Sequence, residues 1–286
     1  MKIQGKSDWS HVYIEETPKE YMLFSAEHNY AVPNYAMRYL LPLFQKISSD
    51  LSRPVNVMDL GSSYGILSTL SWYDITWGEL IEFYTKNRSD TDVIEAIKQF
   101  YAKHPKRQSQ YKPNFYLVDS SEPAIEFSKQ FNLCNEGYVV DLKKDELTTE
   151  LKTSASKADV FLCVGSLSYF GVNFFKQVLP LLNERNFPTI LAFSTYPLFY
   201  YESCADEIES EFRTYGYEFI RCVKPGKGRS MTAEEYQNLK DGKYQIQSDL
   251  CTFENDGYLT SVFYMAVPQD RKTFFENWLA DVDAHF

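Results

Sequence analysis

The sequence predicts an α/β fold built on a mostly parallel sheet with helices on both faces. From Val55 onward, short apolar, strand-like runs alternate with longer runs in which apolar residues recur every three or four positions. This alternation is typical of parallel strands that are buried on both faces. A glycine-containing turn directly follows the first of these strands. Near the C-terminus the alternation ends, because the last two strands are separated by only a loop and a short helical stretch.

The expected elements follow in chain order. Strands are expected at residues 55–59, 114–119, 137–142, 158–165, 187–195, 217–223 and 258–267. Helices are expected at 66–86, 121–133, 172–185 and 204–215. The helix after 119 begins with a Ser-x-x-Ala start and apolar spacing of three and four, which suits a capped amphipathic helix. Together these elements predict a seven-stranded sheet, mostly parallel, with one antiparallel edge strand.

Two segments lie outside this alternation. Residues 1–50 precede the first strand, look helical around 32–47 and hold too little apolar material for a separate core, so we expect a helical cap. The cap is rich in polar aromatic residues, namely Trp9, His11, Tyr13, Tyr21, His28 and Tyr30. Residues 51–286 form the main domain. Within it, residues 77–112 make the first crossover unusually long, and we interpret them as an inserted helical segment that serves as a lid, a partner surface or a plain decoration.

Composition argues against several classes of function. A net charge of −10 and a pI near 5.0 do not suit a broad nucleic-acid footprint, which needs clustered Lys and Arg. No stretch reaches the roughly 18 apolar residues of a membrane span, and the N-terminus has no apolar signal region. The five cysteines lack the spacing of a zinc site or a disulfide framework, which favours a reducing compartment. We therefore expect a cytoplasmic protein that binds neither nucleic acid nor membrane.

The turn after the first strand, in VNVMDLGSSYGIL, is the strongest candidate for a ligand site. A glycine-rich turn between strand and helix directs backbone N–H groups to the sheet edge where ligands bind in open α/β folds. No Lys follows the second glycine, so the phosphate-loop pattern fails. The dinucleotide pattern fails as well, because Ser63 and Ile66 stand where glycines are needed. Asp59 at the strand's end would repel a pyrophosphate and attract a cation, although a plain tight turn is the alternative.

These residues resemble the first motif of the class I S-adenosylmethionine-dependent methyltransferases, which have a Rossmann-like seven-stranded sheet. That motif runs acidic-x-Gly-x-Gly-x-Gly, and DLGSSYG matches it at Asp59, Gly61 and Gly65. Ser63 replaces the middle glycine. The resemblance implies that the loop, including Ser62 and Ser63, lies against the amino-acid moiety of the cofactor, and that Asp59 helps to hold its ammonium group.

The resemblance extends along the rest of the chain, where it implies further cofactor-binding positions. Asp119 ends the second strand, where the family has an acidic residue on the ribose hydroxyls, and Ser120 follows it. The remaining cofactor-binding positions are Asp141 and Leu142 near the adenine, and Gly165 and Ser166 beside the reaction centre. Tyr169, at the same strand end, is a candidate catalytic residue. The implied cofactor is S-adenosylmethionine, and no metal is implied.

The acceptor is expected to be a small molecule. Enzymes that methylate adenine or glutamine carry an Asn/Asp-Pro-Pro-Tyr motif after the fourth strand. In this chain the corresponding segment reads GSLSYF, so the motif is missing. Cys163 lies inside that strand and is expected to be buried, so it does not suit the nucleophile of cytosine methylation. Methyl transfer from a sulfonium is an in-line displacement, and alignment and exclusion of water contribute most to its catalysis. An amine or phenol acceptor must also lose a proton, and His28 and His11 are the candidate bases. A cofactor-binding protein that transfers no methyl group and a protein-acceptor methyltransferase remain as alternatives.

Overall fold

The computed structural model describes residues 10–86, 93–108, 112–169, 171–182, 189–200, 204–244 and 249–285. Its strands are β1 (Asn56–Leu60), β2 (Asn114–Asp119), β3 (Glu136–Val139), β4 (Val160–Val164), β5 (Ile190–Thr195), β6 (Tyr217–Arg221), β7 (Gly226–Ser230) and β8 (Tyr258–Pro268). Its helices are α1 (Lys19–Glu27), α2 (Val32–Leu51), α3 (Ile66–Trp72), α4 (Trp77–Lys86), α5 (Val93–Lys103), α6 (Glu122–Gln130), α7 (Thr149–Ala155), α8 (Asn173–Leu182), α9 (Ala205–Thr214), α10 (Ala233–Lys240) and α11 (Lys272–Ala284). Short 3₁₀ turns are η1 (Ser10–Tyr13), η2 (Leu167–Tyr169), η3 (Pro197–Phe199), η5 (Glu254–Asp256) and η6 (Gln269–Arg271).

The described strands form one sheet in the order β3-β2-β1-β4-β5-β8-β6. The first five run parallel, and β8 is antiparallel to both β5 and β6. The predicted mostly parallel α/β sheet is therefore confirmed. The antiparallel strand lies one place in from the edge, because β6 pairs on its outer side. β7 is an additional strand that the sequence does not predict, and it pairs with the first part of β8.

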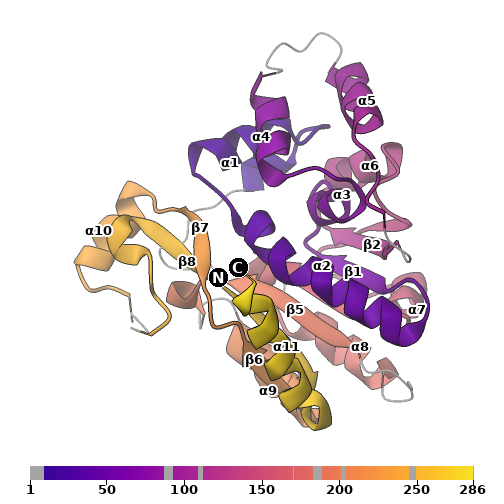
Figure 1. The fold of residues 1–286 in the computed structure, drawn as a ribbon, viewed down its shortest axis with the longest axis vertical. Helices are drawn as coiled ribbons and strands as arrows, with labels where there is room; N and C mark the ends of the chain where they lie inside the picture. The colour runs from indigo at the N-terminus through magenta and orange to yellow at the C-terminus, as the bar shows by residue number, and fades with distance from the viewer. Residues whose placement is uncertain are drawn as a thin grey trace.

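Helices cover both faces of the sheet, as expected. In Figure 1, α2 and α11 lie in front of the strands, and α8 and α9 lie behind them. α2 contacts α11, while α8 packs against α9. Apolar residues of β1, β4 and β5 are almost completely buried between these layers. Among the described residues, no helix combines the length and the apolar character needed to cross a bilayer.

The expected cap over residues 1–50 has two parts with different surroundings. η1 and α1 lie away from the sheet face, next to α4 (Figure 1). α2 instead packs on the sheet, and Tyr39, Leu40 and Phe44 on it belong to the main core. Only the first part is positioned to cover a site at the sheet's edge.

The inserted segment supports the cap. It forms α4 and α5, and α4 packs directly against α1. The indole N–H of Trp77, at the start of α4, donates to the Tyr30 carbonyl at 2.8 Å. The link between α1 and α2 is also held from the other side, where the Ala31 N–H donates to the Gly228 carbonyl of β7 at 2.7 Å. The insertion and β7 thus fix the cap segment from both sides.

Candidate functional site

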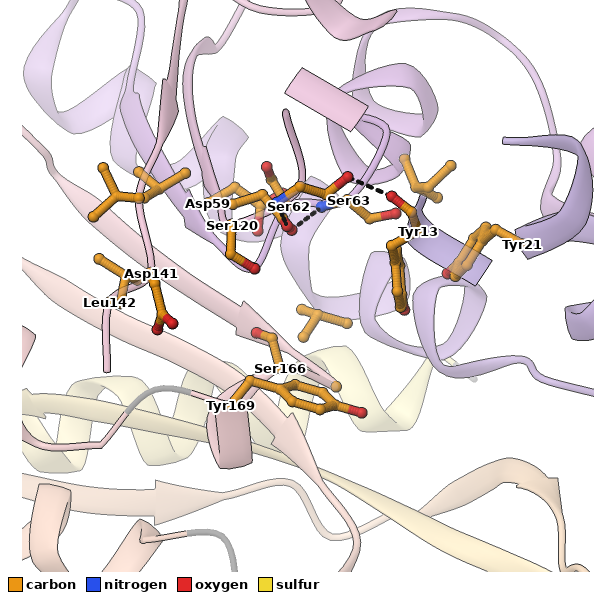
Figure 2. Close-up of a pocket in the computed structure, with 18 of the residues that line it drawn as sticks. Tyr13, Tyr21, Asp59, Ser62, Ser63, Ser120, Asp141, Leu142, Ser166 and Tyr169 are labelled. Carbon is orange, nitrogen blue, oxygen red and sulfur yellow. Dashed lines mark hydrogen bonds between the residues drawn. The ribbon is translucent and has the colours of Figure 1, made fainter. Parts of the chain in front are cut away.

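A cavity of about 680 Å³ lies at the carboxyl ends of the parallel strands, under η1 and α1. Its walls come from the loops after β1, β2, β3 and β4 and from the cap. The predicted cofactor-binding residues that line it are Asp59, Gly61, Ser62, Ser63, Asp119, Ser120, Asp141, Leu142, Gly165 and Ser166. Figure 2 shows Asp141 and Leu142 at one end, Tyr13 and Tyr21 at the other, and the loop residues between them. Residues that lie far apart in the sequence are brought together here because parallel strands end at one edge.

The loop after β1 turns back sharply through left-handed backbone conformations. Gly61, Ser63 and Gly65 have φ values of 72°, 53° and 68°. The Gly61 N–H donates to the Val118 carbonyl at 2.8 Å, which ties the loop to the end of β2. Ser63 therefore adopts, at the place of the family's middle glycine, the backbone conformation that a glycine would favour.

The two glycines of the loop serve packing within the protein. A Cβ on Gly61 would lie 2.4 Å from the Cβ of Ser166, whose hydroxyl donates to the Leu60 carbonyl at 2.6 Å. The close approach at Gly61 is thus made by the end of β4, not only by a ligand. Gly65 does not line the cavity. A Cβ there would lie 3.0 Å from the Ser128 hydroxyl, so its small size lets α3 approach α6.

Asp59 is a buried carboxylate without a full set of partners. Its side chain is 1% exposed and lines the cavity, and Oδ2 has no hydrogen-bond partner among the described residues. The pKa of Asp59 is raised to about 8, mainly by burial and in smaller part by the charge of Asp119. The hydroxyls of Ser62 and Ser63 are also buried without a partner in the described part of the chain.

The other buried carboxylates of the described residues are satisfied on both oxygens. Asp159 accepts two bonds from the Arg53 guanidinium, at 2.8 and 2.9 Å. Glu235 accepts two from Arg229, both at 2.6 Å. Glu254 accepts from the N–H and hydroxyl of Thr260, and Asp283 from the Tyr39 hydroxyl and the Val223 N–H. A buried carboxylate normally has such partners, so Asp59 is the exception that a ligand would complete.

Asp119 lies beside the loop and binds it. It accepts the Ser63 N–H at 2.7 Å on one carboxylate oxygen and the Ser121 N–H at 2.9 Å on the other. Burial raises the pKa of Asp119, and the backbone N–H bonds from Ser121, Ser63 and Ser120 oppose this rise. Carboxylate oxygens have further lone pairs, so both can still accept hydroxyls from the cavity side.

Asp141 occupies the opposite end of the cavity and is stabilised as an anion. Lys144 Nζ lies 2.7 Å from its Oδ2, and the Lys143 N–H donates to Oδ1 at 3.1 Å. The hydrogen bond from Lys144 lowers the pKa of Asp141, and this lowering outweighs the opposing effect of burial. Charge at this end is therefore locally balanced.

The cap brings aromatic side chains to the remaining wall. Tyr13, Tyr21 and Tyr30 line the cavity together with Tyr169 of η2. The ring centroid of Tyr21 lies 5.6 Å from that of Tyr13 and 6.3 Å from that of Tyr30. The sequence groups these three tyrosines in the cap, and the structure places them on the site, as it does Tyr169.

The structure does not place either candidate histidine side chain on the cavity wall. His28 ends α1, where its ring stacks on Phe24 at 3.9 Å and its Nδ1 lies 3.0 Å from the Phe24 carbonyl. It is not among the residues that line the cavity. The backbone of His11 belongs to η1, its side chain lies outside the described part of the structure, and Trp9 lies outside the described residues altogether.

Sequence reasoning missed several residues that hold the site together. The Tyr64 hydroxyl donates to the Glu15 carbonyl at 2.8 Å, and the Ser121 hydroxyl donates to the Tyr13 carbonyl at 2.5 Å. Both tie the cap segment to the cofactor-side loops. Ser121 also caps α6 by accepting the Ala124 N–H at 3.2 Å, as the Ser-x-x-Ala start predicts. The tertiary role of these hydroxyls leaves no signal in a single sequence.

Known proteins resemble this chain in structure only. No protein-family model matches it, and no curated protein does. Among solved structures, magnesium protoporphyrin IX methyltransferase (ChlM) from Synechocystis PCC 6803 with bound SAM has 10% identity and a TM-score of 0.36, covering 93% of this chain and 88% of that chain. The plantazolicin methyltransferase BpumL in complex with a monoazolic desmethylPZN analog and SAH has 16% identity and a TM-score of 0.42, covering 88% of this chain and 91% of that chain. The cyclase SpnF has 10% identity and a TM-score of 0.37, covering 81% and 80%.

The fold itself follows from the sheet described above. Five parallel strands in the order β3-β2-β1-β4-β5 are continued by an antiparallel β8 and an outer β6, with the cavity at the carboxyl edge. The chain therefore has a Rossmann-like α/β fold. The fold class that the sequence predicts, a mostly parallel sheet with helices on both faces, is confirmed.

Proposed function

We propose that this protein is an S-adenosylmethionine-dependent methyltransferase that acts on a small molecule. The observation that carries the proposal is the buried Asp59 carboxylate, which lines the cavity and whose Oδ2 has no hydrogen-bond partner among the described residues. A ligand ammonium group would complete it and would favour its charged form. S-adenosylmethionine offers an ammonium group, a ribose diol and an adenine, which fit the parts of the cavity at Asp59, at Asp119 and at Asp141.

The described residues fit this cofactor in character. Asp59 would hold the ammonium group, Asp119 would accept from the ribose hydroxyls, and Asp141 with Leu142 would flank the adenine. The Ser62 and Ser63 hydroxyls, buried without partners in the described residues, are available to the cofactor's carboxylate. When bound, the cofactor supplies an electrophilic methyl group on a sulfonium.

The protein's own contribution is positioning and exclusion of water. The cap covers the cavity and is tied down by the Tyr64 and Ser121 hydroxyls and by the Trp77 indole. A covered, aligned site accelerates an in-line displacement without a strong base. Tyr169, beside Ser166 at the end of β4, is proposed to contact the acceptor (Figure 2). A small acceptor is favoured because the cavity, at about 680 Å³, has the size typical of sites for small ligands and must also hold the cofactor.

Calorimetric titration with S-adenosylhomocysteine tests the binding part of the proposal. We expect Asp59→Asn and Asp119→Ala each to weaken binding by about 1.5–3 kcal/mol, the range for a lost hydrogen bond to a charged group. Asp270→Asn, an exposed residue of η6 away from the cavity, is the matched control and should bind as the wild type does. Thermal melting confirms that each variant is folded.

Two results would contradict the proposal. One is folded wild-type protein that gives no heat with S-adenosylhomocysteine or S-adenosylmethionine, and the other is a tighter titration with NAD. Methyl transfer is tested separately, by incubating the protein with methyl-labelled cofactor and small metabolites or peptides. Tight cofactor binding with no labelled product would favour a non-transferring protein, and labelled peptide would favour a protein acceptor.

A further inference from the structure

The cap end of the cavity is an aromatic chamber, which we define by Tyr13, Tyr21, Tyr30 and Tyr169. Three of these side chains come from the cap and one from η2 after β4. Trp77 closes the chamber from outside, with its ring 6.4 Å from Tyr21 and 6.4 Å from Tyr30. The Tyr30 hydroxyl reaches the end of β4, since a Cβ on Gly165 would lie 2.7 Å from it. The chamber therefore adjoins the strand end where the reaction centre is proposed.

No basic side chain faces the chamber among the described lining residues. The described lysines of the cavity wall are Lys143 and Lys144, and Lys144 pairs with Asp141. Figure 2 shows Asp141 at the end opposite Tyr13 and Tyr21. The charged groups nearer the chamber are the carboxylates Asp59 and Asp119. Arg229 interacts electrostatically with Tyr30, but it does not line the cavity and is paired with Glu235 at 2.6 Å. An anionic acceptor would therefore meet like charge from the carboxylates, and no described side chain that lines the chamber supplies a compensating cation.

The three phenols that the cap contributes to the chamber remain neutral. Burial raises the pKa of Tyr13, Tyr21 and Tyr30 well above the usual value, and the charge of Asp119 adds to the rise at Tyr13, as that of Asp59 does at Tyr21. Neutral phenol rings present the electron-rich faces that attract cations. Their hydroxyls can both donate and accept, so they are polar partners without charge.

We propose that the acceptor is an amine, which the aromatic chamber binds as a cation and which is methylated at nitrogen; this rests on the proposed methyl transfer. The ammonium form first loses a proton to water at the cavity mouth. The nitrogen lone pair then bonds to the methyl carbon while the carbon–sulfur bond breaks, and that electron pair stays on sulfur as a neutral thioether. The organic remainder of the amine has an apolar exit, because Ile14 and Tyr169 on the wall are 68% and 48% exposed.

Three probes of one shape and different charge test the chamber. Tetramethylammonium, tert-butyl alcohol and pivalate share a compact, methyl-rich body and carry positive, zero and negative charge. Ligand-observed NMR measures their dissociation constants on full-length protein saturated with S-adenosylhomocysteine. We expect tetramethylammonium to bind at least about tenfold more tightly than the alcohol, in line with a desolvated cation–π contact, and pivalate to bind more weakly than both.

Variants locate the binding. Tyr30→Leu removes one ring and should weaken tetramethylammonium by about fivefold or more, whereas Tyr30→Phe keeps the ring and should retain most of the affinity. Tyr236→Leu on α10, a half-buried tyrosine that does not line the cavity, is the matched control and should leave probe binding unchanged. Melting curves and S-adenosylhomocysteine titrations on each variant show whether the fold and the cofactor end are intact.

Equal binding of cation and alcohol, tighter binding of pivalate, or tetramethylammonium binding that survives Tyr30→Leu would overturn the inference. Failure of S-adenosylhomocysteine to bind is a separate result and would overturn the proposed function instead. With labelled cofactor, transfer to phenethylamine but not to the matched hydrocinnamate is expected, and the rate should rise with pH as the amine loses its proton. Preferred transfer to the carboxylate would contradict the amine assignment.

Discussion

At the scale of single residues, Ser63 carries a conformational cost that its neighbour Ser62 does not. Ser63 has φ of 53°, while Ser62 is not in the left-handed region, and both hydroxyls are buried without a partner in the described residues. A non-glycine residue in that region costs of the order of 1 kcal/mol or more. We therefore expect Ser63→Gly to stabilise the ligand-free protein by about 1 kcal/mol in chemical denaturation.

Ser62→Gly is the matched control for that substitution. It removes a similar buried hydroxyl but relieves no strain, so it should destabilise the protein by about 0.5–1 kcal/mol through the entropy of the unfolded chain. If both variants shift stability in the same direction, the left-handed conformation of Ser63 is not the source of the effect. Either substitution should weaken S-adenosylhomocysteine if its hydroxyl contacts the cofactor.

Asp59 should make the ligand-free protein less stable as pH rises. Its folded pKa is about 8, above the value near 4 of an unfolded aspartate, so the folded state holds more protons between these values. Stability from this group is thus complete below about pH 4 and is lost as pH rises through about 8. Relative to wild type, Asp59→Asn should gain stability steadily across this range in urea denaturation.

The same pH series contains its own checks. Asp270→Asn should follow the wild-type curve, because that residue is exposed. Saturating S-adenosylhomocysteine should flatten the wild-type decline, since an ammonium group beside Asp59 favours its ionised form. Parallel curves for wild type and Asp59→Asn would show that the carboxylate ionises as easily in the fold as in the unfolded chain.

At the scale of elements, the α4–α5 insertion is predicted to hold the cap in place. Trp77 of α4 and Trp72 of α3 form a matched pair, because each is nearly buried and each donates its indole N–H to a backbone carbonyl, at 2.8 Å to Tyr30 and 2.9 Å to Pro113. Replacing either by Phe leaves a carbonyl unsatisfied and should cost about 1–3 kcal/mol. Only Trp77→Phe should speed hydrogen exchange in peptides covering residues 19–31.

The comparison with Trp72→Phe separates a local role from general destabilisation. Both variants should lower the melting temperature, but exchange in the cap should stay at the wild-type rate in Trp72→Phe. Equal cap exchange in the two variants would mean that α4 is a decoration on the cap and not its support.

The elements that the sequence predicts well are those whose apolar pattern decides their place. β2 occupies the expected residues 114–119, and β1, β4, β5 and β8 lie within one to three residues of the expected bounds. β7 is missed because Gly226–Ser230 reads GKGRS, which has no apolar pattern. These residues form a strand because the first part of β8 extends past the other strands and pairs with Gly226–Ser230. The ion pair between the buried Arg229 and Glu235 allows the arginine to be accommodated there.

For the site, sequence position was a better guide than residue chemistry. Asp59, Asp119 and Asp141 were predictable because each lies at or just after the carboxyl end of a parallel strand, and such ends meet at one edge. His28 was chosen for its chemistry, but the end of α1 turns its ring onto Phe24 one turn earlier. The isolation of Asp59 could not be predicted, since it depends on which side chains fail to reach it. Tertiary packing decides both the orientation of the His28 ring and the isolation of the Asp59 carboxylate.

At the scale of the whole molecule, the core does not divide at residue 50. α2 buries Tyr35, Leu40 and Phe44 in the same core as the strands, and the Tyr39 hydroxyl donates to Asp283 of α11 at 2.7 Å. A chain that begins at residue 51 would expose one face of the sheet and leave a buried carboxylate oxygen without its partner. We therefore expect residues 51–286 not to form a stable fold when produced alone.

The contrasting truncation removes residues 1–18 and keeps α1 and α2. It deletes η1, including the cavity-lining Tyr13 and the buried Val12, but leaves the sheet covered. We expect this chain to fold with a lower melting temperature and to lose methyl transfer far more than S-adenosylhomocysteine affinity, because the lost contribution is alignment of the acceptor.

Scanning calorimetry of the full chain should show one transition that the cofactor product shifts as a whole. A cooperative melt and wild-type cofactor affinity for 51–286 would contradict this expectation. They would show that the N-terminal fifty residues are a separable cap and that the core does not need the buried face of α2.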